Sequence, residues 1–439
     1  MSKLRVTTAY SRFGSVAAVA EWVAQVGLCA VPPCDVKLID LIGELERLKN
    51  AAAALQARAA MELRRVREAE AAESGTNPRR VGPAVAAELA LARRESPHRG
   101  AVLLGLAAVL LRELPATLLS FRSGEISEWR AGLVARETAC LAREDRAAVD
   151  AQLFAELPTL SDRQLVARAR ALSYRLDPHS VVARVAQAEA DRRVTIRPAP
   201  DCMAQVSALL PVVQGVALFA ALKSAADSAQ AAGDSRSRGQ MMADTLVERG
   251  TGLARAASVP VEVHMVMTDA ALLDDSQVPA RLDDHGPIPA RVARRIASIA
   301  AESDALWLRR LYVARTEQRL VAMDSNRRLF PAGLKRFIRT RDEVCRTPWC
   351  GAPIRHVDHV TPVHAGGTTT FDNGQGLCLR CNQIKEAPGW AANSQPAGVR
   401  LSTPTGHEYF SRPPPLPAEP APRWRTSDGR FAIRFVVAA

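Results

Sequence analysis

The chain has 439 residues, of which 48% are hydrophobic and 24% are charged, a balance that is typical of a soluble globular protein and not of a disordered one. This length is enough for two or three domains with a sizeable core. The net charge of +12 favours a polyanionic partner such as nucleic acid, although an arginine-rich composition can also reflect coding bias.

Neither the cysteines nor the N-terminus indicates export. The eight cysteines, four of them in one short segment, lack the pattern of a secreted disulfide framework and favour cytosolic metal binding. In the N-terminal segment, residues 1–34, Glu21 interrupts the apolar stretch that a signal peptide needs. The uncharged segment 202–222 approaches the length of a membrane span, but polar residues and a proline break it up, so we expect a buried core helix or helix pair there. We therefore expect a soluble, cytoplasmic protein with no membrane partner.

A long helix is predicted from about Asp35 to Glu70. Leucine and alanine residues recur along it at three- and four-residue steps, which is the period of one helix face. The recurring residues are Leu38, Leu41, Leu45, Leu48, Ala52, Leu55 and Ala59. This seam fits packing inside the domain, and it also fits a coiled coil between two chains, which would make a homodimer through the helical domain.

The helical pattern continues through a predicted helical domain of residues 35–250. From Val81 to Glu248, short breaks at prolines and glycines separate helical segments, and Ser161-Asp-Arg-Gln164 has the pattern of a capping box that opens one of them. No strand-like alternation is evident in this region. The domain is therefore predicted to be a bundle of many helices.

Residues 251–340 are predicted to form a mixed and basic connector. The segment 259–268 alternates apolar and polar residues, which predicts a half-buried strand. Residues 307–341 are the most basic stretch of the chain, and Ser325-Asn326 between apolar residues suggests a hairpin. Such a charge run is usually a solvated face, but this one leads directly into the cysteine-rich segment, which favours contact with phosphate.

Two cysteine pairs near the C-terminus have the spacing of a zinc site. A C-x4-C pair and a C-x2-C pair are separated by a loop long enough to fold back, so their thiolates can close a tetrahedral site. The four residues are Cys345, Cys350, Cys378 and Cys381. Cys29 and Cys34 repeat the C-x4-C spacing, but no partner pair or histidine lies nearby, so we do not expect a second metal site there.

The cysteine pairs bracket side chains that suit the hydrolysis of a phosphodiester. Asp358 and His359 lie between the pairs, together with Asn373, and Asn382 and Lys385 follow the last cysteine. Hydrolysis requires a nucleophilic water, neutralisation of charge on the phosphoryl oxygens and stabilisation of the departing 3′ oxygen. A histidine base together with one divalent cation can provide all three.

The segment from Arg341 to Trp390 resembles the HNH endonuclease family. The similarity lies in R-D-x-x-C-x4-C, D-H-V-x-P, G-G-T-T, D-N-G-Q-G-L-C, C-N-x-x-K-E and P-G-W, which follow one another in the family's order. Through looser features, the upstream region resembles the helical domain of unknown function that accompanies such nucleases in many high-GC bacterial proteins. These features are Leu114-Pro115 before Gly124-Glu-Ile-Ser127, then Asp177-Pro178-His179, then Asp234-x-Arg236-x3-Gln240-x2-Ala243-Asp244.

The resemblance implies a β-β-α unit at residues 341–392. Its first strand would be Arg355–His359, its second strand would lie near Gly376-Leu377, and its helix would start after Cys378. A proline-rich tail, residues 393–439, would follow and be mostly extended. The predicted fold is therefore mainly α, with a multi-helix N-terminal domain followed by a small, zinc-stapled α+β nuclease domain of the ββα-metal type.

The resemblance also implies a role for each polar residue. His359 would deprotonate the attacking water, Asp358 and Asn382 would hold Mg²⁺ or Mn²⁺ through oxygen, and Asn373 would hydrogen-bond across its loop and fix the orientation of His359. Lys385, one turn past Asn382, would contact phosphate, unless it is simply an exposed helix lysine. Many family members have a histidine where this chain has Asn382, a replacement that favours harder cations such as Mg²⁺.

Together these observations predict a metal-dependent endonuclease that acts on DNA, with duplex DNA as the expected form, a structural Zn²⁺ and a catalytic Mg²⁺ or Mn²⁺. The alternative is a zinc-stabilised nucleic-acid-binding protein with a degenerate or unused nuclease site. The enzyme is favoured because a pure binding module would not need His359, Asp358, Asn373 and Asn382. RNA stays open as a substrate, since the site lacks an obvious discriminator for the 2′-hydroxyl.

Overall fold

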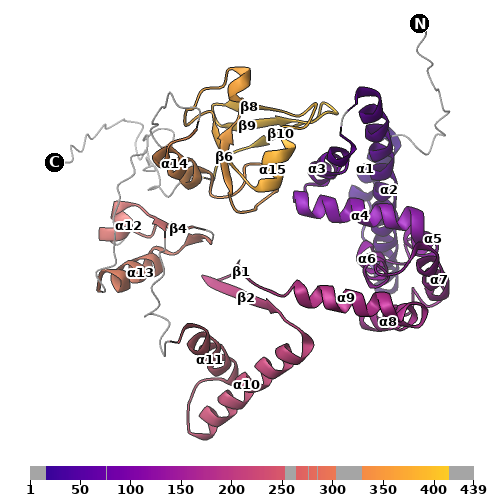
Figure 1. The fold of residues 1–439 in the computed structure, drawn as a ribbon, viewed down its shortest axis with the longest axis horizontal. Helices are drawn as coiled ribbons and strands as arrows, with labels where there is room; N and C mark the ends of the chain where they lie inside the picture. The colour runs from indigo at the N-terminus through magenta and orange to yellow at the C-terminus, as the bar shows by residue number, and fades with distance from the viewer. Residues whose placement is uncertain are drawn as a thin grey trace. The chain divides into compact units, whose positions relative to one another are not determined.

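The fold is described from a computed structural model, which covers residues 16–75, 77–252, 264–274, 276–283, 285–302 and 329–414 (Figure 1). The chain divides into two units, one of Met1–Ala59 and Leu106–Asp177 and the other of Ala60–Gly105 and Pro178–Ala439. Helices dominate the N-terminal part, and a small α+β module lies in the C-terminal part. The predicted fold class is therefore confirmed.

The first unit is a helical bundle. It contains α1 (Val16–Gly27), the first part of α2 (Asp35–Ser74), the end of α4 (Pro97–Glu113), α5 (Pro115–Arg122), α6 (Glu128–Glu137), α7 (Arg143–Leu153) and α8 (Asp162–Leu176). Its core is a single cluster of buried apolar side chains that includes Leu110, Leu114, Phe121, Ile126, Leu153, Leu157 and Leu165. The predicted capping box is confirmed: Ser161 and Gln164 exchange hydrogen bonds at the start of α8.

The motif Gly124-Glu-Ile-Ser127 forms the turn between α5 and α6. Gly124 has a φ of +81°, and a Cβ there would lie 2.5 Å from the backbone oxygen of Arg47, so only glycine allows this approach of the turn to α2. The carbonyl of Gly124 accepts a hydrogen bond from the buried side chain of Asn50. Ser127 then caps α6 through the backbone N–H of Arg130. The motif therefore fixes one corner of the bundle.

A second motif, Leu114-Pro115, begins α5, and its cap comes from another helix. Leu114 provides no side-chain cap, so the first N–H groups of α5 need an acceptor from elsewhere. The fully buried carboxylate of Asp150 on α7 accepts hydrogen bonds from the backbone nitrogens of Ala116 at 2.6 Å and Thr117 at 2.9 Å, and from the Thr117 hydroxyl. Asp150 thus ties α7 to the start of α5.

The seam along α2 stays largely exposed in the described residues. Leu45, Leu48 and Leu55 each expose 40% or more of their surface. The first part of α2 also exposes Val36 and Ile39. Self-association through this helix stays a prediction.

The second unit begins with an α-helical part and a β-ribbon. It contains the end of α2, α3 (Val81–Arg93), most of α4, α9 (Pro178–Ala190), β1 (Arg193–Ala199), β2 (Met203–Leu209), α10 (Val212–Ala231) and α11 (Arg238–Thr251). The strands β1 and β2 pair antiparallel, with Val194 opposite Ala208 and Ile196 opposite Val206. The expectation of helix throughout residues 81–248 is therefore wrong at these strands. The buried core helix or helix pair expected at 202–222 is wrong in its first half, which is β2, whereas residues 212–222 are helical as the start of α10 but mostly exposed. A turn at Asp201 and Cys202, both with positive φ, reverses the chain, and the residues of both strands are almost all exposed.

The motif around Asp234 organises the start of α11. Ser237 and Gln240 form a capping box. Arg236, just before α11, forms ion pairs with Asp234 and, at 2.6 Å, with Asp244 inside the helix. The hydrogen bonds from Arg236 lower the pKa of Asp234 to about 2. These polar residues therefore have a structural explanation in a helix terminus.

The predicted basic connector, residues 251–340, is described in part. Of the strand expected at residues 259–268, β3 (Met265–Val266) lies within the described part, and it pairs with β4 (Ala280–Leu282), which pairs with β5 (Gly286–Ile288). The helices α12 (Asp269–Leu273) and α13 (Ala290–Glu302) accompany this sheet. The expected hairpin around Ser325-Asn326 and most of the basic run fall outside the described residues.

The C-terminal module carries the cysteines and the candidate site. It consists of α14 (Ala332–Asp342), β6 (His356–His359), β7 (Gly374–Leu377), α15 (Leu379–Ile384), β8 (Ala391–Gln395), β9 (Gly398–Ser402) and β10 (Glu408–Ser411), drawn in orange and yellow in Figure 1. The β-β-α order of β6, β7 and α15 is confirmed. The expectation of a mostly extended tail after residue 392 is wrong as far as residue 411, because β8, β9 and β10 form an antiparallel sheet.

Within the described residues, no single helix is long and apolar enough to cross a membrane. The pair formed by α4 and α5, which is bent by 113°, passes that test on length and composition when the two helices are taken together.

We predict that Asp150→Ala lowers the free energy of unfolding by about 2 to 4 kcal/mol, because two buried N–H groups and a hydroxyl lose their acceptor together. Urea unfolding of the full chain, followed by circular dichroism, measures the change. Glu144→Ala, which removes an exposed carboxylate from the same α7, is the control and should cost less than about 0.5 kcal/mol. Equal midpoints for the two variants would show that Asp150 is not a structural cap.

Candidate active site and metal centre

The scaffold of the site depends on a buried carboxylate at the end of α14. Asp342 is fully buried and accepts hydrogen bonds from the backbone N–H of Gly376 at 2.7 Å and from the side chain of Arg341. Arg341 also donates to the carbonyl of Gly374, and Arg346 donates to that of Ser411. Burial lowers the pKa of Arg346 to about 10. The R-D pair of the sequence therefore fastens α14 to β7.

His359 ends β6, opposite Gly374 of β7. Its imidazole is buried, packs against the ring of Phe330 with centroids 4.5 Å apart, and places Nε2 2.9 Å from the hydroxyl of Thr369. Gly374 leaves room for this arrangement, since a Cβ there would lie 2.3 Å from Ile338. The position of the predicted base is thus set by packing as well as by the strand.

Asp358 and Lys385 form an ion pair beside His359. The Lys385 Nζ atom lies 3.1 Å from Oδ2 of Asp358, and the other carboxylate oxygen accepts the backbone N–H of His359 at 2.8 Å. The Lys385 side chain is 7% exposed and that of Asp358 is 33% exposed. Lys385 is therefore not the exposed helix lysine that the sequence allowed as an alternative. Lys385 also pairs with Glu386. A cationic group is thereby held at the edge of a carboxylate that remains partly open.

Asn382 contributes an oxygen atom that has no hydrogen-bond partner among the described residues. Its Oδ1 atom is buried and unpaired, which is costly for an amide oxygen. Asn382 lies on α15, which packs against β6, the strand that carries Asp358. A carboxylate and an unpaired amide oxygen are the donors that Mg²⁺ or Mn²⁺ prefers, so these residues fit such a cation.

Asn373 closes the loop between β6 and β7. Its Oδ1 accepts the backbone N–H of Thr361 at 2.8 Å, and its Nδ2 donates to the carbonyls of Thr361 and Thr368. Gly367 makes this closure possible, because a Cβ there would lie 1.8 Å from the Thr361 oxygen. The amide thus bonds across the loop as a bridge between backbone segments.

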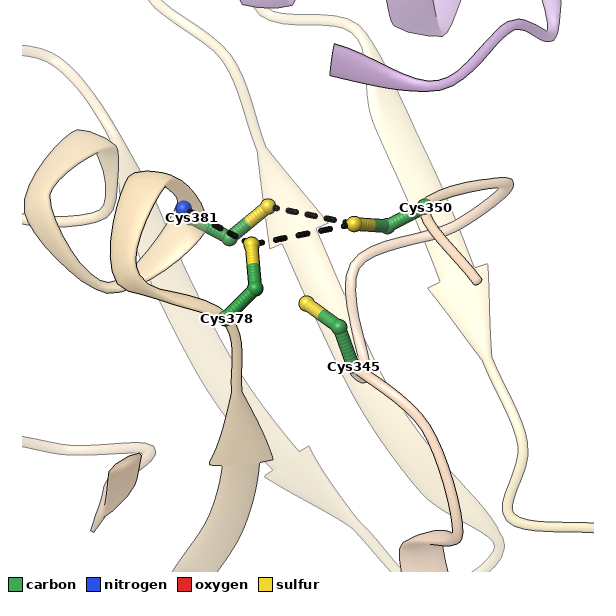
Figure 2. A group of neighbouring side chains, drawn as sticks. All are labelled: Cys345, Cys350, Cys378 and Cys381. Carbon is green, nitrogen blue, oxygen red and sulfur yellow. Dashed lines mark hydrogen bonds between the residues drawn. The ribbon is translucent and has the colours of Figure 1, made fainter. Parts of the chain in front are cut away.

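The four cysteines of the two predicted pairs come together at the base of α15. Their sulfur atoms all lie within 4.8 Å of one another, the only such cluster of possible metal ligands that the described ranges contain. Figure 2 shows Cys378 and Cys381 on the helix side and Cys345 and Cys350 on the facing loop, with the sulfurs turned toward a common centre. Four sulfur ligands at this spacing form the donor set of a structural zinc site.

Mutual hydrogen bonding separates the pKa values of these thiols. The hydrogen bond with Cys350 lowers the pKa of Cys345 to about 7. The hydrogen bond with Cys345 likewise lowers the pKa of Cys378 below the ordinary thiol range. The hydrogen bonds with Cys345 raise the pKa of Cys350 and of Cys381, so these two thiols keep their protons more firmly. Thiolates are the form that binds metal, so Cys345 and Cys378 are the two ligands that the cluster favours before a metal binds.

Several other cysteines and histidines of the sequence are exposed. Cys29 and Cys34 are exposed and belong to no metal-ligand cluster in the described part of the chain. His356 and His364 are exposed. Sequence reasoning had assigned no role to Thr369 or Asp342, although both belong to the recognised motifs G-G-T-T and R-D. Their partners, a buried ring and a backbone N–H, are visible only in the folded chain.

We predict that the protein carries about one zinc per chain and that Cys378→Ser loses this zinc and unfolds the C-terminal module, because metal binding and folding are coupled in so small a unit. Elemental analysis together with limited proteolysis of the full chain measures both effects. Cys29→Ser, which removes an exposed thiol outside the cluster, should keep the metal. Stoichiometric zinc in a variant that lacks all four clustered thiols would refute the assignment.

Comparison with known families agrees with this geometry. The model of the family described as "Domain of unknown function (DUF222)" matches residues 42–342, and the model described as "HNH endonuclease" matches residues 344–387. No curated protein and no solved structure matches the chain. The second match contains the four clustered cysteines together with His359 and Asp358. The chain therefore belongs to the DUF222 family and carries an HNH endonuclease domain behind its DUF222 domain.

Proposed function

We propose that the protein is a metal-dependent endonuclease that hydrolyses phosphodiester bonds in duplex DNA. The observation that carries this proposal is the group formed by Asp358, His359 and Lys385, in which a buried imidazole, a partly open carboxylate and a held ammonium group adjoin one another. A module that only binds nucleic acid gains nothing from a buried histidine in this setting. The HNH domain supports a nuclease, and its match covers all three residues.

In this proposal His359 acts as the general base. It removes one proton from water, the water oxygen bonds to phosphorus, and the bond from phosphorus to the 3′ oxygen breaks as that oxygen takes up a proton from solvent. Lys385 offsets negative charge on the phosphoryl oxygens while it stays near Asp358. The ring contact with Phe330 and the hydrogen bond with Thr369 keep the imidazole in place during these steps.

Asp358 and Asn382 would hold the catalytic cation through oxygen. Mg²⁺ or Mn²⁺, when bound there, supplies charge neutralisation at the phosphate and at the departing oxygen. The unpaired Oδ1 atom of Asn382 is the feature of the structure that supports this ligand pair. Both side chains bind metals through oxygen and not through nitrogen or sulfur, so the set favours a hard cation.

The nucleic-acid partner is supported by charge around the module. Lys335, Arg336 and Arg339 on α14 are exposed, as is Arg355 just before β6. The chain as a whole has a net charge of +12. Exposed cations of this kind gain affinity for phosphates by releasing counterions, so DNA binding should weaken steeply as the salt concentration rises.

We predict that the protein nicks or cuts plasmid DNA in the presence of Mg²⁺ or Mn²⁺ and that His359→Ala slows cutting by about a hundredfold or more, because the general base is lost. DNA retention should be unchanged, since the exposed lysine and arginine side chains of the module are untouched. The control is His407→Ala, which removes an exposed histidine from the same module and should cut normally.

The same assay separates the two candidate functions. A His359→Ala variant that cuts as fast as the wild type would rule out the mechanism. A wild-type protein that retains DNA but never cuts it with either cation would support the zinc-stabilised binding protein in its place. Parallel incubation with an RNA transcript tests the choice of DNA as substrate.

A second variant tests the ammonium group. Lys385→Met keeps the buried aliphatic stem and removes the charge, so zinc content should be unchanged while nicking falls by about a hundredfold. Lys223→Met on α10, an exposed lysine outside the module, is the control. If both variants nick at the wild-type rate, Lys385 has no part in the reaction.

A further inference from the structure

The imidazole of His359 is held on two sides, and the two ring nitrogens face different surroundings. Nε2 lies 2.9 Å from the Thr369 hydroxyl, and both side chains are buried. Nδ1 lies on the side of Asp358, 3.8 Å from its Oδ1 atom. The ring face packs on Phe330 with the planes tilted by 39°. The edge with Nε2 is therefore turned into the module, and the edge with Nδ1 is turned toward the carboxylate.

We propose that Thr369 is a positioning residue for the nuclease reaction, whose hydroxyl accepts a hydrogen bond from Nε2–H of His359 and so makes Nδ1 the nitrogen that takes the proton from water. This inference rests on the proposed nuclease function. A neutral imidazole has one N–H nitrogen and one basic nitrogen, and fixing the hydrogen on Nε2 leaves the basic lone pair on Nδ1. The water proton ends on Nδ1, and the resulting imidazolium keeps its bond to Thr369.

The hydroxyl of Thr369 is itself placed by Asn373. The carbonyl of Thr368 accepts a hydrogen bond from Asn373 Nδ2 at 2.8 Å, and the hydroxyl of Thr370 accepts one from the Asn373 backbone N–H at 3.2 Å. Both chain neighbours of Thr369 are thus fastened to the same residue. Asn373 acts on His359 along this route, from the amide through the loop backbone to the threonine hydroxyl.

The hydroxyl and the shape of Thr369 can be tested separately. Thr369→Val keeps the branched shape and removes the hydroxyl, whereas Thr369→Ser keeps the hydroxyl and removes a methyl group. If packing alone mattered, the valine variant would resemble the wild type and the serine variant would not. If the hydrogen bond matters, the order is reversed. Thr405→Val, at an exposed hydroxyl between β9 and β10 of the same module, is the control.

The first readout is plasmid nicking at fixed Mg²⁺ concentration. We expect Thr369→Val to nick roughly tenfold to a hundredfold more slowly, in line with the loss of a partner that orients a functional histidine, while zinc content is unchanged. Thr369→Ser should stay within about threefold of the wild type, and Thr405→Val should match it. A valine variant as active as the wild type would overturn the proposal.

The second readout needs no cleavage. The ¹⁵N NMR shifts of the histidine rings, recorded without added divalent cation at a pH where imidazole is neutral, report which nitrogen carries the hydrogen, and His359→Ala identifies the signal. The wild type and Thr369→Ser should show the Nε2–H form, and Thr369→Val should show a mixture. An Nδ1–H form in the wild type would overturn the proposal, even if the valine variant failed to fold. A wild type that shows the Nε2–H form but never cuts DNA would refute the nuclease function and leave the Thr369 contact established.

Discussion

The geometry of the site depends on how one very short helix is held. α15 spans only Leu379–Ile384, too few residues to be a stable helix in water by itself, yet it carries Asn382 and is followed at once by Lys385. Cys378 caps this helix and Cys381 lies inside it, so a metal bound by the cluster fixes both its start and its rotation. The geometry of the proposed active site therefore depends on thiolates that lie outside it.

The strands beside that helix are held by buried polar groups rather than by a large apolar core. The carboxylate of Asp342 is fully buried, so it is stable only while its hydrogen bonds to the Gly376 backbone and to Arg341 are made. Those bonds require one placement of β7 against α14. The hydrogen bonds between the Asn373 side chain and the Thr361 backbone likewise fix the conformation of the loop that leads into β7. Buried polar residues thus decide where His359 stands.

What could be predicted from the sequence is what depends on short spacings. The cysteine pairs, the strand that ends at His359 and the helix after Cys378 all follow from residues a few positions apart. The ribbon of β1 and β2 was missed because its short alternation, around Val194 and Ile196, lies between long helical segments. The sheet of β8, β9 and β10 was missed because the prolines that follow it dominated the composition. The contacts of Thr369 could not be predicted, because they depend on how the loop before β7 folds back. The spacing of residues in the sequence does not determine that conformation.

The two metal environments of the module adjoin in the sequence and differ in chemistry. Cys381 belongs to a set of four soft sulfur ligands, whereas the next residue, Asn382, offers an oxygen to the proposed catalytic cation. Zinc prefers sulfur and nitrogen, and Mg²⁺ prefers oxygen. A histidine at position 382 would give the proposed catalytic site a nitrogen ligand. That nitrogen would compete for zinc directly beside Cys381, a ligand of the four-cysteine site. The amide removes that competition, so ligand chemistry alone can direct each cation to its own site in a module of this size.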